Sequence, residues 1–292
     1  MWRVLLAALL FAMPAQAHLD RYPDFKSAHV LARNVIVWTP DDYDPKGPPL
    51  PVLYMHDGQN VFEASTANFG VEWAVDEALT RMKRRAIVVG SWSTKLRGRE
   101  YLPAKVAALL PEDTRQRVEA VHGGPSLADA YLRFLVEELK PFIDKTYRTL
   151  PDAAHTSIMG SSMGGLISLY ALAEYPQVFG QAAALSVHWP LADPTKATPE
   201  EADQVASAFK AYLASSRVRP GVNRLYMDHG SVNLDSFYRP YSTRMEAILP
   251  ALGWVAGKSW VSRVYEGTDH NEAAWAARVE IPLGFLLGPA GQ

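Results

Sequence analysis

The pattern GSSMG at residues 160–164 is the first part of this sequence whose residue types and spacing could do chemistry. It matches G-x-S-x-G and lies between an apolar run over 156–159, typical of a strand, and an apolar helical pattern over 163–174. A turn this sharp from strand to helix requires glycine on both sides and exposes the serine hydroxyl. We therefore predict that Ser162 is the nucleophile of an acyl-transfer reaction.

A base for Ser162 has to come from one of eight histidines. A serine hydroxyl is a poor nucleophile at neutral pH and needs a base within hydrogen-bond reach. His270 follows a predicted strand over 260–265 and precedes the last helical pattern, where the chain order Ser, Asp, His places the base. His155 lies at the wrong end of its predicted strand. We therefore predict His270 as the general base.

Two carboxylates qualify as the acid that orients the imidazole and stabilises its protonated form. Asp228 ends the strand predicted over 224–227, and Asp235 lies in the loop that follows it. The longer loop gives Asp235 more reach toward His270, so we expect Asp235 to be the acid. Asp228 stays open as the alternative, with a role in holding the turn if Asp235 is the acid. Asp269 is too close to His270 along the chain to form the required hydrogen bond.

An oxyanion hole requires two backbone N–H groups near the nucleophile. The amide of Met163, directly after Ser162, is expected to supply one. The second should come from the polar loop after the short apolar run 52–55, where Gly58 lets the backbone bend and turn the amide of Gln59 inward. We expect Asp57 and Asn60 mainly to form the turn.

Three further residues are candidates for substrate binding. His188 and Trp189 follow the strand predicted over 182–187 and should therefore lie on the rim of the site, because chemistry sits at the carboxyl ends of parallel strands. Arg99, in the long segment 92–125, could bind an anionic substrate or pair with its neighbour Glu100. The sequence has no H-E-x-x-H, P-loop or dinucleotide pattern, so we predict neither a metal ion nor another cofactor.

Charge and cysteine content exclude several classes of protein. The net charge of −2 and the lack of a basic stripe argue against a nucleic-acid partner. The sequence has no cysteine, which excludes disulfides and thiol catalysis. With 48% hydrophobic residues, a chain of this length can bury a sizeable core without such cross-links.

Residues 1–17 have the features of a cleavable signal peptide. Arg3 precedes an apolar stretch over 4–13, and Ala15 and Ala17 form a small-x-small cleavage site. The apolar stretch is shorter than the roughly 20 residues that span a bilayer. We therefore expect a mature chain that begins near His18, has no stable membrane span and is periplasmic or secreted.

Strand and helix patterns alternate through the rest of the chain. This alternation predicts one α/β domain over 18–292 with a mostly parallel sheet covered by helices on both faces. The segment 29–38 has roughly alternating β-formers and is expected to be an antiparallel edge strand. Residues 92–125 have little regular patterning and are expected to form a long surface excursion, whereas a strong helical pattern follows the cap residue Ser126.

These segments together resemble the putative-esterase family of α/β-hydrolases, which includes esterase D-like enzymes, feruloyl esterases, enterochelin-type siderophore esterases and mycolyltransferases. The matching stretches are residues 54–62, 99–103, 160–165 and 267–270, which together span nearly the whole mature chain. The resemblance implies an α/β-hydrolase fold, Ser162 and His270 as catalytic residues, and an oxyanion hole made by the amides of Gln59 and Met163. The chain departs from the pattern at the acid, because Asn233 stands where several relatives carry a carboxylate.

We therefore predict an exported serine carboxylic-ester hydrolase that acts on a small-molecule ester through an acyl-serine intermediate. An acyltransferase would use the same three residues and differ only in what attacks the acyl-enzyme. A non-catalytic binding protein on a hydrolase scaffold is the alternative from another class. The identity of the ester is beyond the reach of sequence, because one fold serves many substrates.

Overall fold

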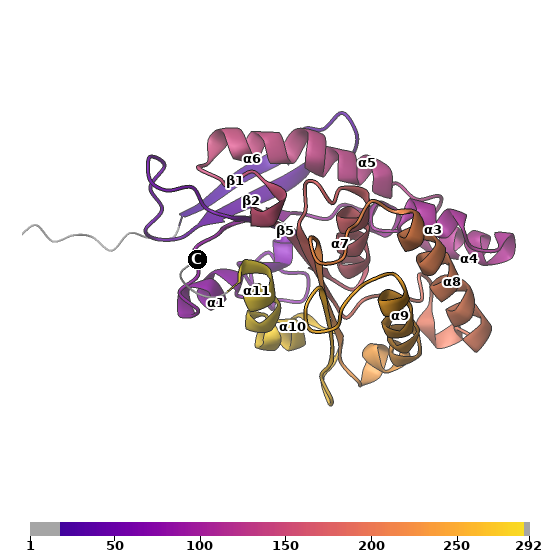
Figure 1. Ribbon diagram of the computed structural model, residues 1–292. Coiled ribbons are helices and arrows are strands. Elements are labelled where there is room, and N and C mark those ends of the chain that lie inside the picture. Colours follow the sequence, from indigo (N-terminus) through magenta and orange to yellow (C-terminus); the bar gives the residue numbers. More distant parts are fainter. Residues whose placement is uncertain (1–17, 289–292) are drawn as a thin grey trace, which may run out of the picture.

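An eight-stranded sheet forms the centre of the computed structural model, which describes residues 18–288 (Figure 1). The predicted signal peptide, residues 1–17, lies outside the described residues. The sheet order is β1-β2-β4-β3-β5-β6-β7-β8. Strands β1 and β2 and strands β2 and β4 pair antiparallel, and all other neighbours are parallel. The strands are β1 (His18–Phe25), β2 (Arg33–Thr39), β3 (Val52–His56), β4 (Ile87–Ser91), β5 (Thr156–Ser161), β6 (Gln181–Leu185), β7 (Arg224–His229) and β8 (Trp260–Val264).

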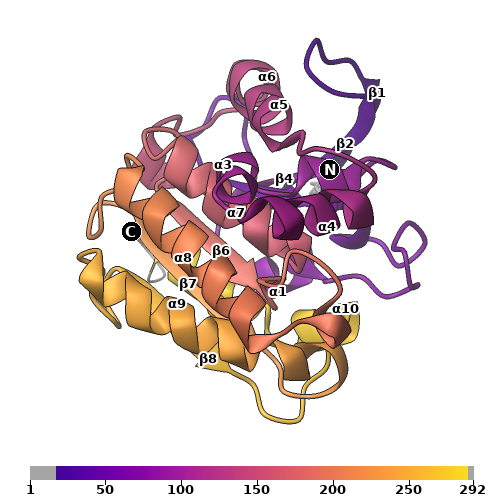
Figure 2. The same ribbon diagram turned by 90° about the vertical axis from the view of Figure 1, so that its right-hand side faces the viewer.

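Helices cover both faces of this sheet, as the alternating pattern predicted (Figures 1 and 2). One face carries α1 (Val75–Arg81), α10 (Glu272–Arg278) and α11 (Glu280–Leu287). The opposite face carries α3 (Ala104–Ala108), α4 (Glu112–His122), α5 (Ala128–Arg133), the π-helical turn η2 (Phe134–Leu139), α6 (Lys140–Thr146), α7 (Met163–Glu174), α8 (Pro199–Ser215) and α9 (Arg239–Ala251). Short helices connect these elements: η1 (Gly58–Asn60), α2 (Arg97–Glu100), η3 (Ala153–His155), η4 (Pro194–Lys196) and η5 (Asn233–Phe237).

Alternate residues of the central strands enter two separate hydrophobic clusters. In β3, Tyr54 packs into the cluster under α7, while Leu53 and Met55 pack into the cluster under α1 and α11. Every residue of β3 is buried, because helices cover both faces of the parallel part of the sheet. This packing holds the carboxyl ends of β3, β5, β6 and β7 at one edge of the sheet, where the predicted site residues follow.

Two sequence-based expectations about this fold are wrong. The segment 92–125 is not irregular, because it contains α2, α3 and α4. In α4 only Thr114 and Val118 are buried, so the helix has almost no apolar stripe to read in the sequence. Its charged residues pair along and off the helix instead, as Arg117 does with Asp113 and Glu201.

The second correction concerns the sheet edge. The antiparallel strand expected over 29–38 is β2, but it is not the edge strand, because β1 pairs with its outer side. The sequence of β1 is polar and its residues are mostly exposed or half-buried, so it lacks the apolar pattern by which a strand is predicted. The helix expected after Ser126 is confirmed, but its cap residue is Leu127. The hydroxyl of Ser126, one residue earlier, accepts a hydrogen bond from the N–H of Ala128 at 3.0 Å.

Candidate active site

Ser162 lies on the sharp turn between β5 and α7, as the glycine pattern predicted. Its backbone has φ 57° and ψ −124°, a region that side chains rarely adopt and that costs on the order of 1–3 kcal/mol. A Cβ atom at Gly160 would approach the carbonyl carbon of Gly164 to 2.8 Å, so only glycine permits this close approach. The N–H of Ser162 donates to the carbonyl of Leu185 at 2.8 Å, which ties the turn to the neighbouring strand β6.

Asp235 and His270 are brought together by two loops at the same edge of the sheet. Asp235 lies in η5, after β7, and His270 lies between β8 and α10. The Nδ1–H of His270 donates to Asp235 Oδ1 at 2.6 Å, and the Asp235 side chain is fully buried. Burial alone would raise the pKa of Asp235, but the hydrogen bond and charge of His270 bring that pKa below its ordinary value. The ionised carboxylate therefore favours the tautomer of His270 with its proton on Nδ1, which leaves Nε2 free to accept a proton.

Tyr238, a buried residue directly after η5, lies near both His270 and Ser162. The rings of Tyr238 and His270 lie edge to face with centroids 5.5 Å apart. Burial raises the pKa of Tyr238, as does the charge of Asp235, while the nearby Ser162 hydroxyl lowers it. Within residues 18–288 no hydrogen bond joins Ser162 directly to His270. Such a contact commonly forms only when substrate is bound.

A network behind Asp235 holds its second oxygen. Asp235 Oδ2 accepts hydrogen bonds from the Ser186 hydroxyl at 2.7 Å and the N–H of Gly230 at 2.6 Å. The Ser186 oxygen in turn accepts from Trp275 Nε1 at 2.9 Å and from Arg278 at 3.0 Å. Both of these groups can only donate, so the hydroxyl proton of Ser186 has to point at Asp235. Sequence reasoning missed this network, although Ser186 directly follows a strand and Trp275 and Arg278 share one face of α10 at i and i+3.

Asp228, the alternative acid, contacts Arg278 instead of His270. Its carboxylate accepts from two guanidinium nitrogens of Arg278 at 3.1 and 3.2 Å, and from the N–H of Ser186 at 3.0 Å. Ser186 has φ 41°, so this backbone bond holds it in a strained conformation. Asp228 therefore anchors the network that supports Asp235, which is close to the structural role considered for it.

Gln59 lies in η1, directly after β3, in a segment whose Asp57 carboxylate lies against the turn that carries Ser162. The side chain of Gln59 is fixed by Ser93, because Gln59 Nε2 donates to the Ser93 hydroxyl at 2.8 Å and Gln59 Oε1 accepts from the Ser93 N–H at 3.1 Å. Among the described residues, no hydrogen bond uses the backbone N–H of Gln59 or Met163. Two free amides are what the predicted oxyanion hole requires.

Asp57 and Arg97 hold this loop against the elbow, the sharp turn between β5 and α7 that carries Ser162. Arg97 forms two hydrogen bonds to the Asp57 carboxylate, at 2.7 and 2.8 Å, and its guanidinium lies over the ring of Tyr101. A Cβ atom at Gly164 would come within 3.4 Å of Asp57 Oδ2, so the carboxylate lies directly against the elbow. Asp57 thus forms the turn, as expected, and also binds an arginine.

The three predicted substrate-binding residues lie in different places. His188 is half-buried: its Nδ1 accepts from the Tyr238 hydroxyl at 2.7 Å, and its Nε2 donates to the carbonyl of Ala192 at 3.0 Å. Burial lowers the pKa of His188 to about 3, so the ring is neutral behind Tyr238. Trp189 is in the core, edge to face with Phe209. Arg99 donates to the carbonyl of Pro125 at 2.8 Å, whereas Arg97, two residues earlier, binds Asp57.

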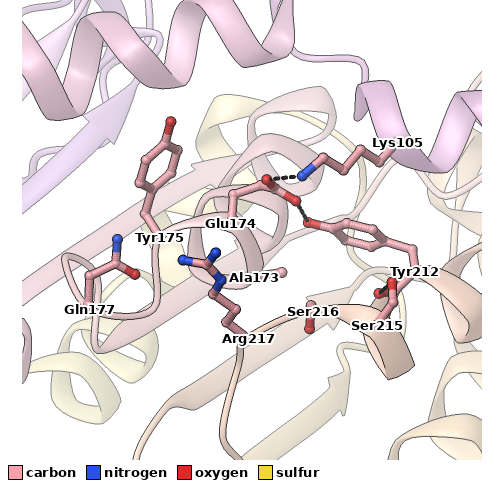
Figure 3. Close-up of a pocket in the computed structure, with 9 residues that line it drawn as sticks. All are labelled: Lys105, Ala173, Glu174, Tyr175, Gln177, Tyr212, Ser215, Ser216 and Arg217. Atoms are coloured by element: carbon pink, nitrogen blue, oxygen red, sulfur yellow. Dashed lines mark hydrogen bonds and ion pairs between the residues drawn. The ribbon is translucent and has the colours of Figure 1, made fainter.

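Of the cavities in the described residues, one is lined by His270. It has a volume of about 320 Å³ and lies between the loop of Phe69 and Val71 and the start of α10. Another cavity, of about 290 Å³, lies at the ends of α7 and α8, where Glu174 binds both Lys105 and Tyr212 (Figure 3). It contains none of the predicted site residues, and its charged groups are largely paired with each other.

Residues 18–288 contain no cluster of three or more histidine or carboxylate side chains that could hold a metal ion. No helix within the same residues is long and apolar enough to cross a bilayer.

Comparison with known proteins gives one family and one fold. The sequence profile of the family described as "Putative esterase" matches residues 31–279. Ferri-bacillibactin esterase BesA of Bacillus subtilis is 29% identical over 145 residues, which make up 48% of this chain and 48% of that protein. The chain thus aligns with about half the length of this curated relative.

Solved structures with the same fold include an IroE-like serine hydrolase from Shewanella oneidensis, with a TM-score of 0.66 at 18% identity, covering 93% of this chain and 79% of that one. A ferulic acid esterase has a TM-score of 0.61 at 18% identity and covers 93% of this chain and 98% of that one. At such low identity the likeness concerns the fold, and it confirms the predicted α/β-hydrolase architecture.

Proposed function

Since the chain belongs to the "Putative esterase" family, we propose that it is an exported serine hydrolase of carboxylic esters that works through an acyl-serine intermediate. The observation that carries the proposal is the 2.6 Å hydrogen bond between His270 and buried Asp235, beside a serine held on a strained turn. Relatives named as esterases of ferri-bacillibactin and ferulic acid support ester hydrolysis as the reaction.

In the first half of the reaction, Ser162 Oγ attacks the ester carbonyl carbon and gives its proton to His270 Nε2. The carbonyl oxygen becomes an anion, which the amides of Gln59 and Met163 stabilise. Loss of one such donor typically costs about 3–4 kcal/mol of transition-state stabilisation. The tetrahedral intermediate then expels the alcohol oxygen, which takes the proton from His270 and leaves the acyl group on Ser162.

In the second half, water replaces the alcohol. His270 accepts a proton from the water as it attacks the acyl carbon, and then returns this proton to Ser162 Oγ as the carboxylic acid leaves. Asp235 stays ionised through both halves and stabilises the protonated imidazole, which its lowered pKa supports. If a sugar or alcohol attacked instead of water, the same residues would catalyse acyl transfer.

The decisive test is labelling and turnover. We expect a fluorophosphonate probe to label the wild type at Ser162 and p-nitrophenyl acetate to be hydrolysed. Ser162→Ala should abolish both, while Ser161→Ala, the neighbouring serine, should keep the label. A wild-type protein that is folded but neither labelled nor active would contradict the proposal and favour a binding protein. Product analysis with added alcohol acceptors separates hydrolysis from acyl transfer.

Export is supported by the signal-peptide pattern over residues 1–17. We expect protein recovered from the periplasm or medium of an expressing bacterium to begin at His18. Intact-mass measurement and amino-terminal sequencing test this, and a chain that retained residues 1–17 in the cytoplasm would contradict it.

A further inference from the structure

Two apolar side chains stand exposed beside the catalytic histidine. Phe69 is 78% exposed and Val71 is 39% exposed, both on the loop between η1 and α1. With four residues around the start of α10 they line the cavity of about 320 Å³: Phe69, Val71, His270, Asn271, Glu272 and Ala273. Single exposed apolar residues need no explanation, but two of them facing a cavity with a catalytic group mark a binding surface.

The loop that carries these side chains is hydrogen-bonded to η1 (Gly58–Asn60), which we call the oxyanion loop because it carries the amide of Gln59. Asn60 Oδ1 accepts from the N–H of Asn68 at 2.9 Å, and the carbonyl of Asn60 accepts from the N–H of Trp73 at 2.8 Å. The hydroxyl of Thr66 donates to the carbonyl of Gln59 at 2.7 Å. Because these bonds bracket Phe69 and Val71, the apolar surface has a set position relative to the amide expected to hold the oxyanion.

The opposite wall of the cavity is tied to the same loop. Asn60 Nδ2 donates to Glu272 Oε1 at 3.3 Å, so the start of α10 is joined to the oxyanion loop through one side chain. Trp275, in the next turn of α10, packs edge to face on His270 with centroids 5.0 Å apart. The cavity is therefore built from the two segments that hold the oxyanion and the base.

The chemistry of His270 decides which part of an ester this cavity faces. When the tetrahedral intermediate collapses, the proton on His270 Nε2 goes to the oxygen of the departing alcohol. That oxygen must therefore lie within hydrogen-bond reach of His270. A cavity with His270 in its wall borders the alcohol side of the ester bond, whereas the acyl group remains bonded to Ser162.

We propose that Phe69 and Val71 form a binding site for the alcohol group of the ester, and that this group is apolar and uncharged, an aromatic ring or a short alkyl chain. The proposal rests on the proposed esterase function, because it uses His270 as the proton donor. No lysine or arginine lines the cavity, and its one carboxylate, Glu272, has a pKa raised by burial, so the site offers no permanent cation to an anionic alcohol.

Two matched series of esters test the proposal. The first keeps acetate as the acyl group and enlarges the alcohol from ethyl to butyl to benzyl; the second keeps ethanol and enlarges the acid from acetate to butyrate to phenylacetate. Burial of one methylene contributes about 0.8 kcal/mol, which is close to fourfold in kcat/KM when complete. We expect kcat/KM to rise about twofold to fourfold per methylene on the alcohol side.

Variants assign the effect to the loop. Phe69→Ala should lower kcat/KM for benzyl acetate about tenfold, leave ethyl acetate within about twofold, and leave the acyl series unchanged. Phe69→Leu, which keeps an apolar side chain, should recover part of the loss. Val71→Ala should act in the same direction more weakly. Its matched control is Val222→Ala, an equally simple truncation of an exposed valine next to the opposite end of β7.

The outcomes separate this inference from the function on which it rests. If wild type hydrolyses ethyl acetate but Phe69→Ala changes the acyl series and not the alcohol series, the assignment of the cavity is overturned. Equal effects of Val71→Ala and Val222→Ala would overturn it too. If no ester in either series is hydrolysed and Ser162 is not labelled, the esterase function itself fails, and the inference fails with it.

Discussion

Two buried arginine–carboxylate pairs lie near opposite edges of the sheet. Arg33 on β2 binds Glu100 on α2 at 2.6 and 3.2 Å, and Arg278 on α10 binds Asp228 at the end of β7 at 3.1 and 3.2 Å. In both pairs the side chains are at most 4% exposed. Each arginine also lies over an aromatic ring, 5.0 Å from that of Tyr131 or Tyr265. By composition and burial the two pairs are nearly the same.

The two pairs differ in the group that each arginine binds besides its carboxylate. Arg33 gives its other hydrogen bonds to the carbonyl of Leu31, so its pair joins backbone and helix only. Arg278 donates to Ser186, and Ser186 donates to Asp235. One pair therefore holds the fold together, while the other also orients Asp235, the proposed catalytic acid. The role of a buried ion pair is therefore decided by the further group that it binds, and it does not follow from the pair itself.

The largest expected effect on kcat distinguishes Asp235 from Asp228, the two carboxylates in the network around Arg278. Asp235→Asn should lower kcat by up to about 10⁴, because an amide cannot hold His270 in the right tautomer. Asp228→Asn should act mainly on stability, since it leaves Arg278 buried without its charge partner. Urea unfolding and kcat per folded molecule measure the two effects. If Asp228→Asn cost more activity than Asp235→Asn, the assignment of the acid would be wrong.

Exchanging each arginine for lysine tests the comparison directly. Breaking a buried pair costs about 3–5 kcal/mol, and lysine retains the charge but loses the planar fork, so the loss for Arg33→Lys and Arg278→Lys should be smaller than this. Both variants should unfold at lower urea concentration. Only Arg278→Lys should lower kcat, because only Arg278 reaches Asp235 through Ser186. Equal kcat values for the two variants would contradict the claim that only Arg278 supports Asp235.

Removing the Ser186 hydroxyl should have a moderate effect on catalysis. Ser186→Ala deletes one donor to Asp235, so the pKa of Asp235 should rise, and kcat should fall about tenfold, close to the value of one hydrogen bond to a charged group. The acid limb of the kcat profile should shift to higher pH. Ser186→Gly removes the same hydroxyl but relieves the positive φ, so it should match the alanine variant in activity and exceed it in stability.

A matched control distinguishes this role from packing. Ser259 is also buried, and its hydroxyl accepts from the N–H of Val255 at the start of β8, away from the catalytic loops. Ser259→Ala should lower stability by a similar amount and leave the pH profile unchanged. A pH profile that shifted equally in the Ser259 and Ser186 variants would show that Ser186 acts through stability alone.

The last prediction concerns stability and one histidine in each of the two regions. Burial lowers the pKa of His56, near Arg33, and of His188, near His270, to about 3. Below the ordinary histidine pKa of about 6.5 the unfolded chain binds protons that the folded protein excludes, so stability falls as pH decreases toward about 3. Each histidine contributes about 1.4 kcal/mol per pH unit in this window. Urea unfolding at pH 7.5 and 5.0 measures it, and His56→Gln should reduce the slope; an unchanged slope would contradict the burial argument.

Local sequence patterns were sufficient to predict structure where the residues that define it are contiguous in the chain. The strand, the glycines and the helix around Ser162 are contiguous, so their arrangement followed from residues 156–174 alone, and β5 and α7 lie where they were predicted. The three helices between residues 97 and 122 and the edge strand β1 were missed, because short or polar elements leave little periodicity in the sequence and are stabilised by contacts with distant parts of the chain.

The sequence by itself determined the nucleophile turn, the alternation that leads to a parallel sheet, and a short choice of residues for the base and the acid. Only the tertiary structure decided that Asp235 contacts His270 while Asp228 holds Arg278. It also decided that Trp189 is in the core and His188 half-buried, while Phe69 is exposed. The physical reason is that a short loop can point a side chain in several directions. The direction is fixed by hydrogen-bond partners such as Ser186 and Trp275, which lie far away in the chain.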